Sequence, residues 1–417
     1  MKFFIKNFGC RLNQFEGDAI FEMLIRAGFV PGNATDSDLI IVNGCTVTSR
    51  ADQKVRQFIH KIMRTNPNAR IILTSCTAEA IRKGILEGIN GVEVVGWENK
   101  FSIDKYILGT PEPSHDRFPR ISRKSVSRTR AWVKIQDGCN RRCAFCIVPV
   151  VRGRSVSRSS RDIIDQIREL TMSGFAEIVL TGVDIGNWSD GKAGLAKLVE
   201  MILSLTDVKV LRLSSLEPPG LTDELIEVFC TNERIAPHLH IPIQSGSERI
   251  LKLMNRDWYK LDELIGRIEK VINCRDGVCI GTDIIVGFPG ENDEDFEATE
   301  RLLRSGYFAY AHIFKFSPRP MTPAYNLKPI PPKTVNERAK RIKEIDRNNR
   351  LSFAKKFVGK ILDFIPERVT EEGVFGHSLN YLKVVAQDSA KRGEISKVLV
   401  EDFAEMTVFG KVLSDVK

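Results

Sequence analysis

The sequence contains no hydrophobic run long enough to cross a bilayer. A spanning helix needs roughly 18–20 consecutive apolar residues, and no stretch of the 417 residues reaches that length. The first segment, MKFFIKNFGCRLNQ, has only a short apolar stretch and passes directly into a strand-like pattern, unlike a signal peptide. No internal repeat at the periods typical of solenoids is present. We therefore expect a cytoplasmic globular protein with no membrane partner.

The nine cysteines are an odd number, which argues against a disulfide framework. Disulfides also seldom persist in the cytoplasm, so some of these thiols are expected to bind metal or take part in catalysis. Cys230 and Cys274 end helical patterns and Cys279 lies in an apolar strand, so these three are interpreted as structural. The remaining cysteines are Cys10, Cys45, Cys76, Cys139, Cys143 and Cys146.

Strand-like and helix-like patterns alternate along residues 1–110. Strands are predicted at residues 3–7, 39–43, 71–74 and 92–95, and helices at 14–27, 49–64 and 79–87. This alternation predicts an N-terminal domain with an open parallel α/β sheet. The segment 111–129 is rich in Pro, Ser and Arg and is interpreted as a linker.

A second alternation occupies residues 130–352. Its predicted strands are 132–136, 177–181, 210–214, 239–243, 279–286 and 312–316, with helical patterns between them. Such units predict a partial (βα)6 barrel. Residues 353–417 then show short strands separated by Gly and polar residues, which predicts a small all-β domain. The expected fold class is therefore α/β with a small C-terminal all-β domain.

The chain carries a formal net charge of +9 at pH 7, which favours contact with a polyanion. Basic residues gather at 117–130, 152–161 and 338–360. The first two segments flank the predicted mouth of the barrel, so phosphate contacts are expected there.

The segment GCNRRCAFC at residues 138–146 places Cys139, Cys143 and Cys146 at the spacing C-x3-C-x2-C. Three thiolates on one loop after a predicted strand can hold three irons of a [4Fe–4S] cluster and leave the fourth open to a substrate. Structural zinc is the alternative, but it takes four protein ligands, and no further Cys or His lies nearby. The spacing therefore favours an iron–sulfur cluster.

Cys10, Cys45 and Cys76 each come directly after a predicted strand, in NFGCRLNQ, IVNGCTVT and ILTSCTAE. Residues just past the carboxyl ends of parallel strands converge on one crevice. We therefore predict a second cluster held by these three cysteines. The alternative is three unrelated small core residues, because free Cys is often buried.

The first motif, with Phe145 before its last cysteine, resembles the signature of the radical S-adenosylmethionine superfamily. The resemblance implies that S-adenosylmethionine binds the open iron and that one electron cleaves it to a 5′-deoxyadenosyl radical, with Cys139, Cys143 and Cys146 as the catalytic set. Polar or small residues near the ends of predicted barrel strands are expected to hold S-adenosylmethionine, together with Phe145. They are Thr181, Gly182, Ser214, Glu217, Gln244 and Asp283.

Two three-cysteine sets in this order resemble the methylthiotransferase family. Further blocks that carry the resemblance are RGRSVSRS, IVLTGVDIG, LRLSSLEP, HLHIPIQSGSERILKLMNR, TDIIVGFPGENDEDFE and FSPRPMTPA. The resemblance implies two [4Fe–4S] clusters, the N-terminal one donating sulfur, together with S-adenosylmethionine, a sulfur source and an electron donor such as flavodoxin or ferredoxin. The terminal all-β domain resembles a TRAM domain, which implies binding of RNA.

Within that family, FGCRLNQFEGD, LRLSSLEP and HIFKFSPRPMTP resemble the branch that modifies threonylcarbamoyladenosine in tRNA. The implied partner is the anticodon stem-loop of tRNA. SCTAEA departs from the Gly–Cys–aromatic–Ala–Gln run of that branch, so the surroundings of Cys76 are expected to differ. The alternatives are methylthiolation of isopentenyladenosine in tRNA or of a ribosomal-protein aspartate, a two-cluster redox protein, and an RNA-binding protein with structural metal.

Overall fold

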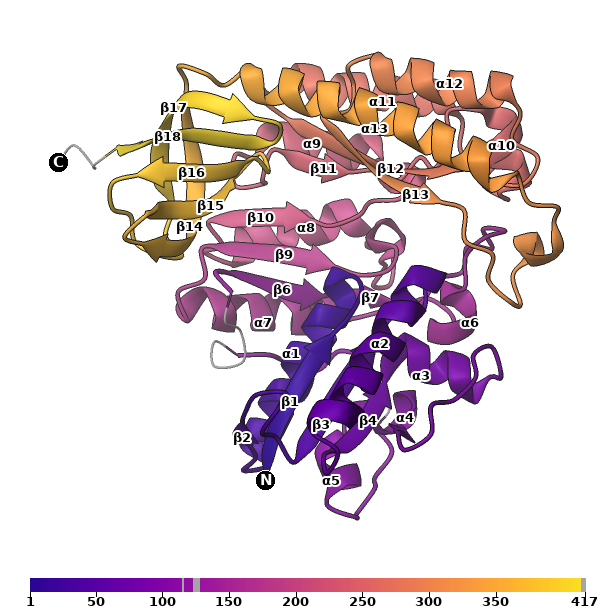
Figure 1. The fold of residues 1–417 in the computed structure, drawn as a ribbon. Coiled ribbons are helices and arrows are strands. Elements are labelled where there is room, and N and C mark those ends of the chain that lie inside the picture. Colours follow the sequence, from indigo (N-terminus) through magenta and orange to yellow (C-terminus); the bar gives the residue numbers. More distant parts are fainter. Residues whose placement is uncertain (115, 123–127, 414–417) are drawn as a thin grey trace. The chain divides into compact units, whose positions relative to one another are not determined.

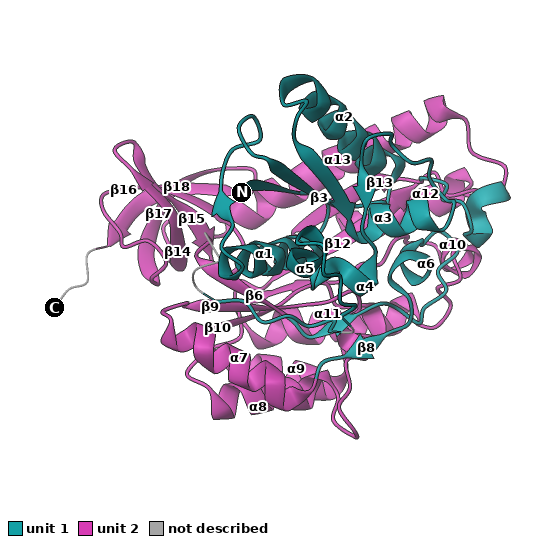
Figure 2. Cartoon of the chain, turned by 90° about the horizontal axis from the view of Figure 1, so that it is seen from below, with its two compact units in different colours: residues 1–127, 134–158, 317–326 teal, residues 128–133, 159–316, 327–417 magenta. Residues whose placement is uncertain are grey.

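The structure is a computed structural model that describes residues 1–114, 116–122 and 128–413. The chain divides into two compact units, drawn in teal and magenta in Figure 2. Unit 1 comprises residues 1–127, 134–158 and 317–326, and unit 2 comprises residues 128–133, 159–316 and 327–417. The predicted domain boundaries near residues 110, 129 and 352 stay predictions, and the linker 111–129 lies partly outside the described residues.

Unit 1 contains a five-stranded parallel sheet in the order β2-β1-β3-β4-β5 (Figure 1). The strands are β1 (Lys2–Asn7), β2 (Val30–Pro31), β3 (Leu39–Gly44), β4 (Arg70–Thr74) and β5 (Glu93–Val94). The helices that follow them are α1 (Arg11–Arg26), α2 (Ser49–Thr65), α3 (Ser75–Arg82), α4 (Trp97–Lys100) and α5 (Ile103–Ile107). The predicted open parallel sheet is confirmed.

The central strand β3 explains why helices cover both faces of this sheet. Leu39 and Ile41 pack with residues of α1 and α5 on one face, whereas Ile40 and Val42 pack with residues of α2 on the other. Successive side chains of a strand point to opposite faces, so a continuous apolar strand requires two apolar cores. Every residue of β3 is accordingly buried.

Unit 1 also contains the segment around the C-x3-C-x2-C motif. Its elements are β7 (Gln136–Asp137), β8 (Val156–Ser157), α6 (Val148–Arg152) and the short 3-10 helix η4 (Pro323–Asn326). The helix α6 packs on α3, and Ile147 and Val151 share an apolar cluster with Cys76 and Ala80. Residues that lie far apart in the sequence therefore pack around Cys76.

Unit 2 contains two three-stranded parallel sheets in the orders β10-β9-β6 and β11-β12-β13. The strands are β6 (Arg130–Lys134, its last residue grouped with unit 1), β9 (Glu177–Thr181), β10 (Val210–Leu213), β11 (His238–His240), β12 (Cys279–Val286) and β13 (Tyr310–Lys315). Single parallel bridges, Leu211 to Ile235 and Ser215 to His240, connect the two sheets. The predicted six-stranded partial barrel is confirmed.

Helices alternate with these strands. They are α7 (Ser160–Met172), α8 (Leu195–Leu205), α9 (Asp223–Thr231), α10 (Glu248–Leu253), α11 (Leu261–Cys274), α12 (Asp293–Arg304) and α13 (Pro332–Lys355), with 3-10 turns η2 (Ile185–Asn187) and η3 (Pro218–Gly220). No helix of the described part of the chain is both long and apolar enough to cross a membrane.

The C-terminal strands close into a small barrel in the order β14-β15-β16-β18-β17. They are β14 (Ile361–Thr370), β15 (Gly373–Ser378), β16 (Lys383–Gln387), β17 (Ser396–Ala404) and β18 (Thr407–Leu413). The barrel core continues into Phe353 of α13 and Cys279 of β12, which pack in the same apolar cluster. The predicted all-β domain is confirmed, and the buried Cys279 has the structural role expected for it.

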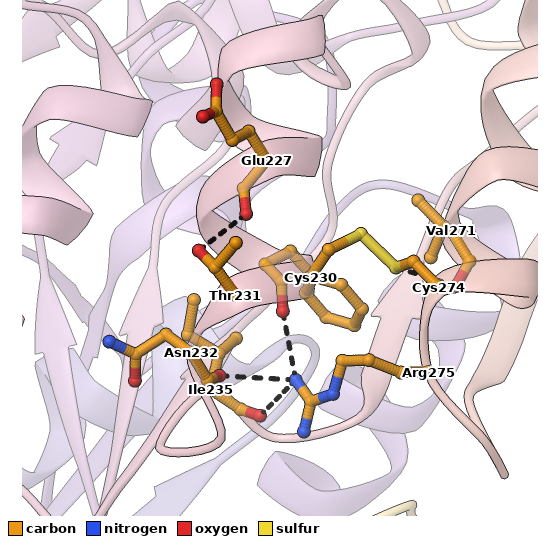
Figure 3. The surroundings of a disulfide bond; sticks show 9 residues. Glu227, Cys230, Thr231, Asn232, Ile235, Val271, Cys274 and Arg275 are labelled. Carbon is orange, nitrogen blue, oxygen red and sulfur yellow. Dashed lines mark hydrogen bonds between the residues drawn. A yellow bond between two sulfur atoms is a disulfide. The ribbon is translucent and has the colours of Figure 1, made fainter.

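The structure differs from the sequence-based expectation for two cysteines. Cys230 at the end of α9 and Cys274 at the end of α11 form a disulfide (Figure 3). Arg275, next to Cys274, donates hydrogen bonds to the carbonyl oxygens of Phe229 and Ile235 at 3.2 and 2.9 Å. Expecting no disulfide was therefore wrong for this pair, because the packing of α9 against α11 brings together residues 44 positions apart.

Candidate active site

The first set of predicted ligands lies at one edge of the sheet of unit 1. Cys10 is the N-cap of α1 just past β1, Cys45 directly follows β3, and Cys76 is the second residue of α3 just past β4. Since β1, β3 and β4 are parallel neighbours, their carboxyl ends lie at the same edge. Cys10 is exposed, and the other two are buried. The structure thus brings the three thiols together, although their role as ligands stays a prediction.

Cys45 lies at the centre of this set. Burial, and then the nearby thiols of Cys76 and Cys10, raise the pKa of Cys45 to about 12. The loop before α1 approaches it closely, since a Cβ on Gly9 would lie 2.8 Å from Cys45 Sγ, and Gly9 has a φ of +94°. Three sulfur donors on rigid strand ends fit a [4Fe–4S] cluster that keeps one iron open.

The connection between β4 and α3, which carries Cys76, is shorter than the sequence predicts. A helix is expected from residue 79, but α3 begins at Ser75, directly after β4. Ser75 has a φ of +72°, in the left-handed region, so the chain turns from strand into helix without a loop. Its Oγ accepts a hydrogen bond of 2.9 Å from Lys100 Nζ, which holds this conformation. Cys76 therefore lies in the first turn of a helix.

Five charged side chains form a buried charge network beside Cys76. Its members, all 0–2% exposed, are Glu16, Lys100, Lys134, Asp137 and Arg152. Glu16 accepts from Lys100 Nζ at 2.6 Å and from Lys134 Nζ and Arg152 Nη1 at 2.9 Å each. Asp137 accepts from Lys134 Nζ at 2.8 Å and Arg152 Nη1 at 3.0 Å. Arg152 Nε donates to Cys76 Sγ at 3.2 Å.

The opposite charges within the network offset the cost of burying its carboxylates. Burial opposes the charge of Glu16, but Arg152, Lys100 and Lys134 hold its pKa well below the ordinary value. Burial lowers the pKa of Lys100 to about 8, against the attraction of Glu16, to which its Nζ donates at 2.6 Å. Sequence reasoning missed this network. The one signal was a lysine, Lys134, inside an apolar strand segment, where a buried charge requires a partner.

For two arginines of residues 152–161, Arg152 and Arg158, burial contradicts the expected phosphate contacts, and Arg338 of residues 338–360 is buried as well. These three arginines are buried, so their guanidinium groups do not face solvent. Arg338 pairs with Glu291 and Asp293, both at 2.7 Å. A run of basic residues in the sequence does not distinguish a solvated face from buried ion pairs.

The second set of cysteines lies on the loop between β7 and α6. Cys139 N donates to Gly153 O at 3.1 Å, and Cys146 N donates to Cys143 O at 3.0 Å. Asp137 Oδ1 accepts from Gly138 N at 2.7 Å, which fixes the start of the loop. Cys143 is buried and the other two cysteines are partly exposed. Three donors on so short a loop fit a cluster with one open iron.

Gly138 is required by the path of this loop. Its φ is +70°, and a Cβ there would lie 2.1 Å from Arg154 O. We expect Gly138→Ala to displace the loop, so that the protein binds about half of the roughly eight irons of two clusters. Iron and acid-labile sulfide analysis after anaerobic reconstitution measures this. Gly266→Ala, in open space on α11, is the matched control and keeps the full iron content. Full iron in the Gly138 variant would contradict the account of the loop.

The predicted S-adenosylmethionine-binding residues lie at several places in unit 2, except Phe145, a half-buried residue of unit 1. Thr181 is the last residue of β9, Gly182 follows it, and Ser214 directly follows β10. Glu217 Oε2 accepts from the buried Arg256 at 2.7 Å. Gln244 lies past β11 with a φ of +68° and donates its N–H to Asp283 O at 2.8 Å. Contact with S-adenosylmethionine stays a prediction for all of them.

Asp283 lies within β12 and belongs to a group that the sequence did not reveal. His240 Nε2 is 3.0 Å from Asp283 Oδ1, and His240 Nδ1 is 3.2 Å from Tyr310 Oη. His312 on β13 pairs in register with Asp283, and the ligand atoms of the two histidines and Asp283 all lie within 4.8 Å of one another. Burial and then His240 lower the pKa of His312. The group depends on strand register, which residue spacing alone does not determine.

Comparison with known proteins adds to this geometry. Residues 133–303 match the Radical SAM superfamily, and residues 2–96 match the Uncharacterized protein family UPF0004. A Thermotoga maritima protein named threonylcarbamoyladenosine tRNA methylthiotransferase MtaB is 33% identical over 413 residues, or 96% of this chain and 94% of the relative. The chain belongs to the radical S-adenosylmethionine methylthiotransferase family. This methylthiotransferase acts on tRNA, and its cofactors are S-adenosylmethionine and two [4Fe–4S] clusters.

Two further likenesses bear on the branch and on the fold. A Novosphingobium aromaticivorans protein named tRNA-2-methylthio-N(6)-dimethylallyladenosine synthase is 31% identical over 384 residues, or 88% of this chain and 86% of the relative. The structure of the radical S-adenosylmethionine methyltransferase TsrM from Kitasatospora setae matches with a TM-score of 0.55 at 14% identity, over 78% of this chain and 76% of that chain. The match to the TsrM structure, at 14% identity, shows only that the two proteins share a fold.

Proposed function

We propose that this methylthiotransferase transfers a methylthio group to C2 of N6-threonylcarbamoyladenosine, next to the anticodon of tRNA. The observation that carries the proposal is the match along nearly the whole chain to a relative named for that nucleoside. The sequence blocks FGCRLNQFEGD, LRLSSLEP and HIFKFSPRPMTP point to the same branch. Isopentenyladenosine is the second candidate, because a relative named for its dimethylallyl form is 31% identical.

In this proposal Cys139, Cys143 and Cys146 hold the cluster that cleaves S-adenosylmethionine, and Cys10, Cys45 and Cys76 hold the cluster that carries the sulfur. With the clusters and S-adenosylmethionine bound, one S-adenosylmethionine would supply a methyl group, and a second, after one-electron reduction, would supply the radical that removes hydrogen from C2. Radical chemistry is needed because no ordinary side-chain base removes an unactivated aromatic hydrogen. The chain itself fixes the two thiol sets on strand ends and on one short loop.

The partners that this function requires are the anticodon stem-loop of tRNA, a sulfur source and an electron donor such as flavodoxin or ferredoxin, all in the cytoplasm. The TRAM-like region 353–417 contains as many acidic as basic residues. Any binding of RNA by this region therefore cannot result from an excess of positive charge alone. The excess positive charge lies in the rest of the chain, where Arg154 and Arg161 are exposed and suited to phosphate.

Nucleoside mass spectrometry of total tRNA tests the branch. In cells that lack the protein, we expect the 2-methylthio form of threonylcarbamoyladenosine to disappear and the unmodified parent nucleoside to accumulate. The isopentenyl counterpart stays at its usual level in the same samples and serves as the internal control. Loss of the methylthio isopentenyl nucleoside, with the threonylcarbamoyl one retained, would replace our choice with the second candidate.

A further inference from the structure

We propose that Arg152 is a positioning residue for the sulfur-carrying cluster: it orients the Cys76 thiolate and, through the net positive charge of the buried network, stabilises the reduced form of the cluster. The inference rests on the proposed assignment of Cys10, Cys45 and Cys76 as ligands. It concerns the five charged residues defined above, which the proposed function does not by itself explain.

The guanidinium of Arg152 is held in one orientation. Its N–H groups number five, and the structure shows five acceptors for them. Nε donates to Cys76 Sγ at 3.2 Å. Nη1 donates to Glu16 and Asp137 at 2.9 and 3.0 Å, and Nη2 donates to Asn13 Oδ1 and Glu16 at 2.5 and 3.0 Å. The ring of Trp97 lies 5.0 Å from the guanidinium carbon. With the other four donors committed, the Nε–H direction toward Cys76 is fixed.

The buried charge network has a net positive charge. Three cations, Lys100, Lys134 and Arg152, face two carboxylates, Glu16 and Asp137, which leaves one positive charge among five buried side chains. A buried charge without a counter-ion is strongly unfavourable. An oxidised [4Fe–4S] core with three thiolates carries about one net negative charge. The charge of the network therefore matches that of the cluster it would face, through the one thiol that Arg152 contacts.

A positive charge near a cluster favours its reduced form, which is more negative by one electron. The interaction is strong here because the groups are buried and poorly screened. The network also joins segments that carry both cysteine sets: Glu16 lies on α1 after Cys10, Asp137 lies two residues before Cys139, and Arg152 ends α6. The same residues thus hold Cys76 and the start of the second cysteine loop in place.

The test uses the full-length chain with Cys139, Cys143 and Cys146 replaced by Ala, reconstituted anaerobically with iron and sulfide, so that a cluster forms only at the assigned N-terminal site. A redox titration followed by electron paramagnetic resonance gives its midpoint potential. Arg152→Gln makes the network neutral, and Glu16→Gln gives it one more positive charge. We expect the potential to fall in the first variant and to rise in the second. Arg152→Lys keeps the positive charge but lacks the planar guanidinium with its several N–H donors. We therefore expect its midpoint potential to lie nearer that of the parent, the chain with the three Cys→Ala replacements, and its electron paramagnetic resonance signal to broaden.

Arg26→Gln is the matched control, because it removes an arginine of α1, the helix that carries Glu16, and the side chain of Arg26 is 69% exposed. Solvent screens such a charge, so the potential stays that of the parent. Equal potentials in the parent, Arg152→Gln and Glu16→Gln would overturn the inference. If Arg152→Gln binds no cluster, the Glu16→Gln variant provides the test. A midpoint potential that does not rise in Glu16→Gln would then refute the inference. No cluster in the parent itself would instead refute the ligand assignment of the proposed function.

Discussion

A Cys143→Ala variant is expected to form no 5′-deoxyadenosine when it is reduced in the presence of S-adenosylmethionine. Cys143 is the buried member of its set, 8% exposed, and its carbonyl oxygen accepts the hydrogen bond that orients Cys146. Two thiols on this loop cannot hold three irons, so the open iron that binds S-adenosylmethionine is lost. Chromatography of the reaction mixture measures 5′-deoxyadenosine and methionine, which appear in equal amounts in the parent enzyme.

The control for this variant removes two cysteines that lie elsewhere. Cys230→Ser with Cys274→Ser eliminates the disulfide and leaves both predicted cluster sets intact, so 5′-deoxyadenosine formation continues at the parent level. Normal cleavage of S-adenosylmethionine by Cys143→Ala would mean that the C-x3-C-x2-C loop is not the site of cleavage. Iron analysis of the same samples separates loss of the cluster from loss of folding, because the N-terminal set still binds its irons.

The placement of Cys10, Cys45 and Cys76 at one edge of the sheet was predictable because it follows from topology. A cysteine directly after a strand of a parallel sheet lies at the carboxyl edge, whatever the details of packing. These three cysteines lie at the same edge for that reason, although 35 and 31 residues separate them along the chain. The open sheet, the partial barrel and the terminal all-β domain were equally predictable from alternating patterns, whereas the start of α3 and short elements such as β2, α5 and α10 were not.

The buried charge network was not predictable in the same way. Each of its members resembles a solvated charge in its own segment, and Arg152 was grouped with basic residues expected to contact phosphate. Only the fold brings Glu16, Lys134 and Arg152 together from α1, β6 and α6. The His240, Asp283 and His312 group has a similar origin, because it depends on the register of β11, β12 and β13. A slip of one residue would turn these side chains to the other face.

The sharpest distinction between the two cysteine sets comes from Cys45→Ala. This variant is expected to keep cleaving S-adenosylmethionine to 5′-deoxyadenosine while making no methylthio product. Cys45 directly follows β3 at the centre of the N-terminal set, so its loss removes one of three ligands from the cluster proposed to carry sulfur. The loop of Cys139, Cys143 and Cys146 is anchored by Asp137 and Gly153 and makes no use of Cys45.

Both products are measured in one reaction, with tRNA from cells that lack the protein as substrate. The parent yields methylthio nucleoside and 5′-deoxyadenosine together, whereas Cys45→Ala yields the second alone. Val47→Ala is the neighbouring control, since its side chain is 43% exposed and we expect both products to persist. If Cys45→Ala made methylthio product at the parent level, the sulfur-carrying role of this set would be wrong. The charge network around Arg152 would then have to be explained as a structural ion cluster, because the thiol it contacts would no longer belong to a sulfur-carrying site.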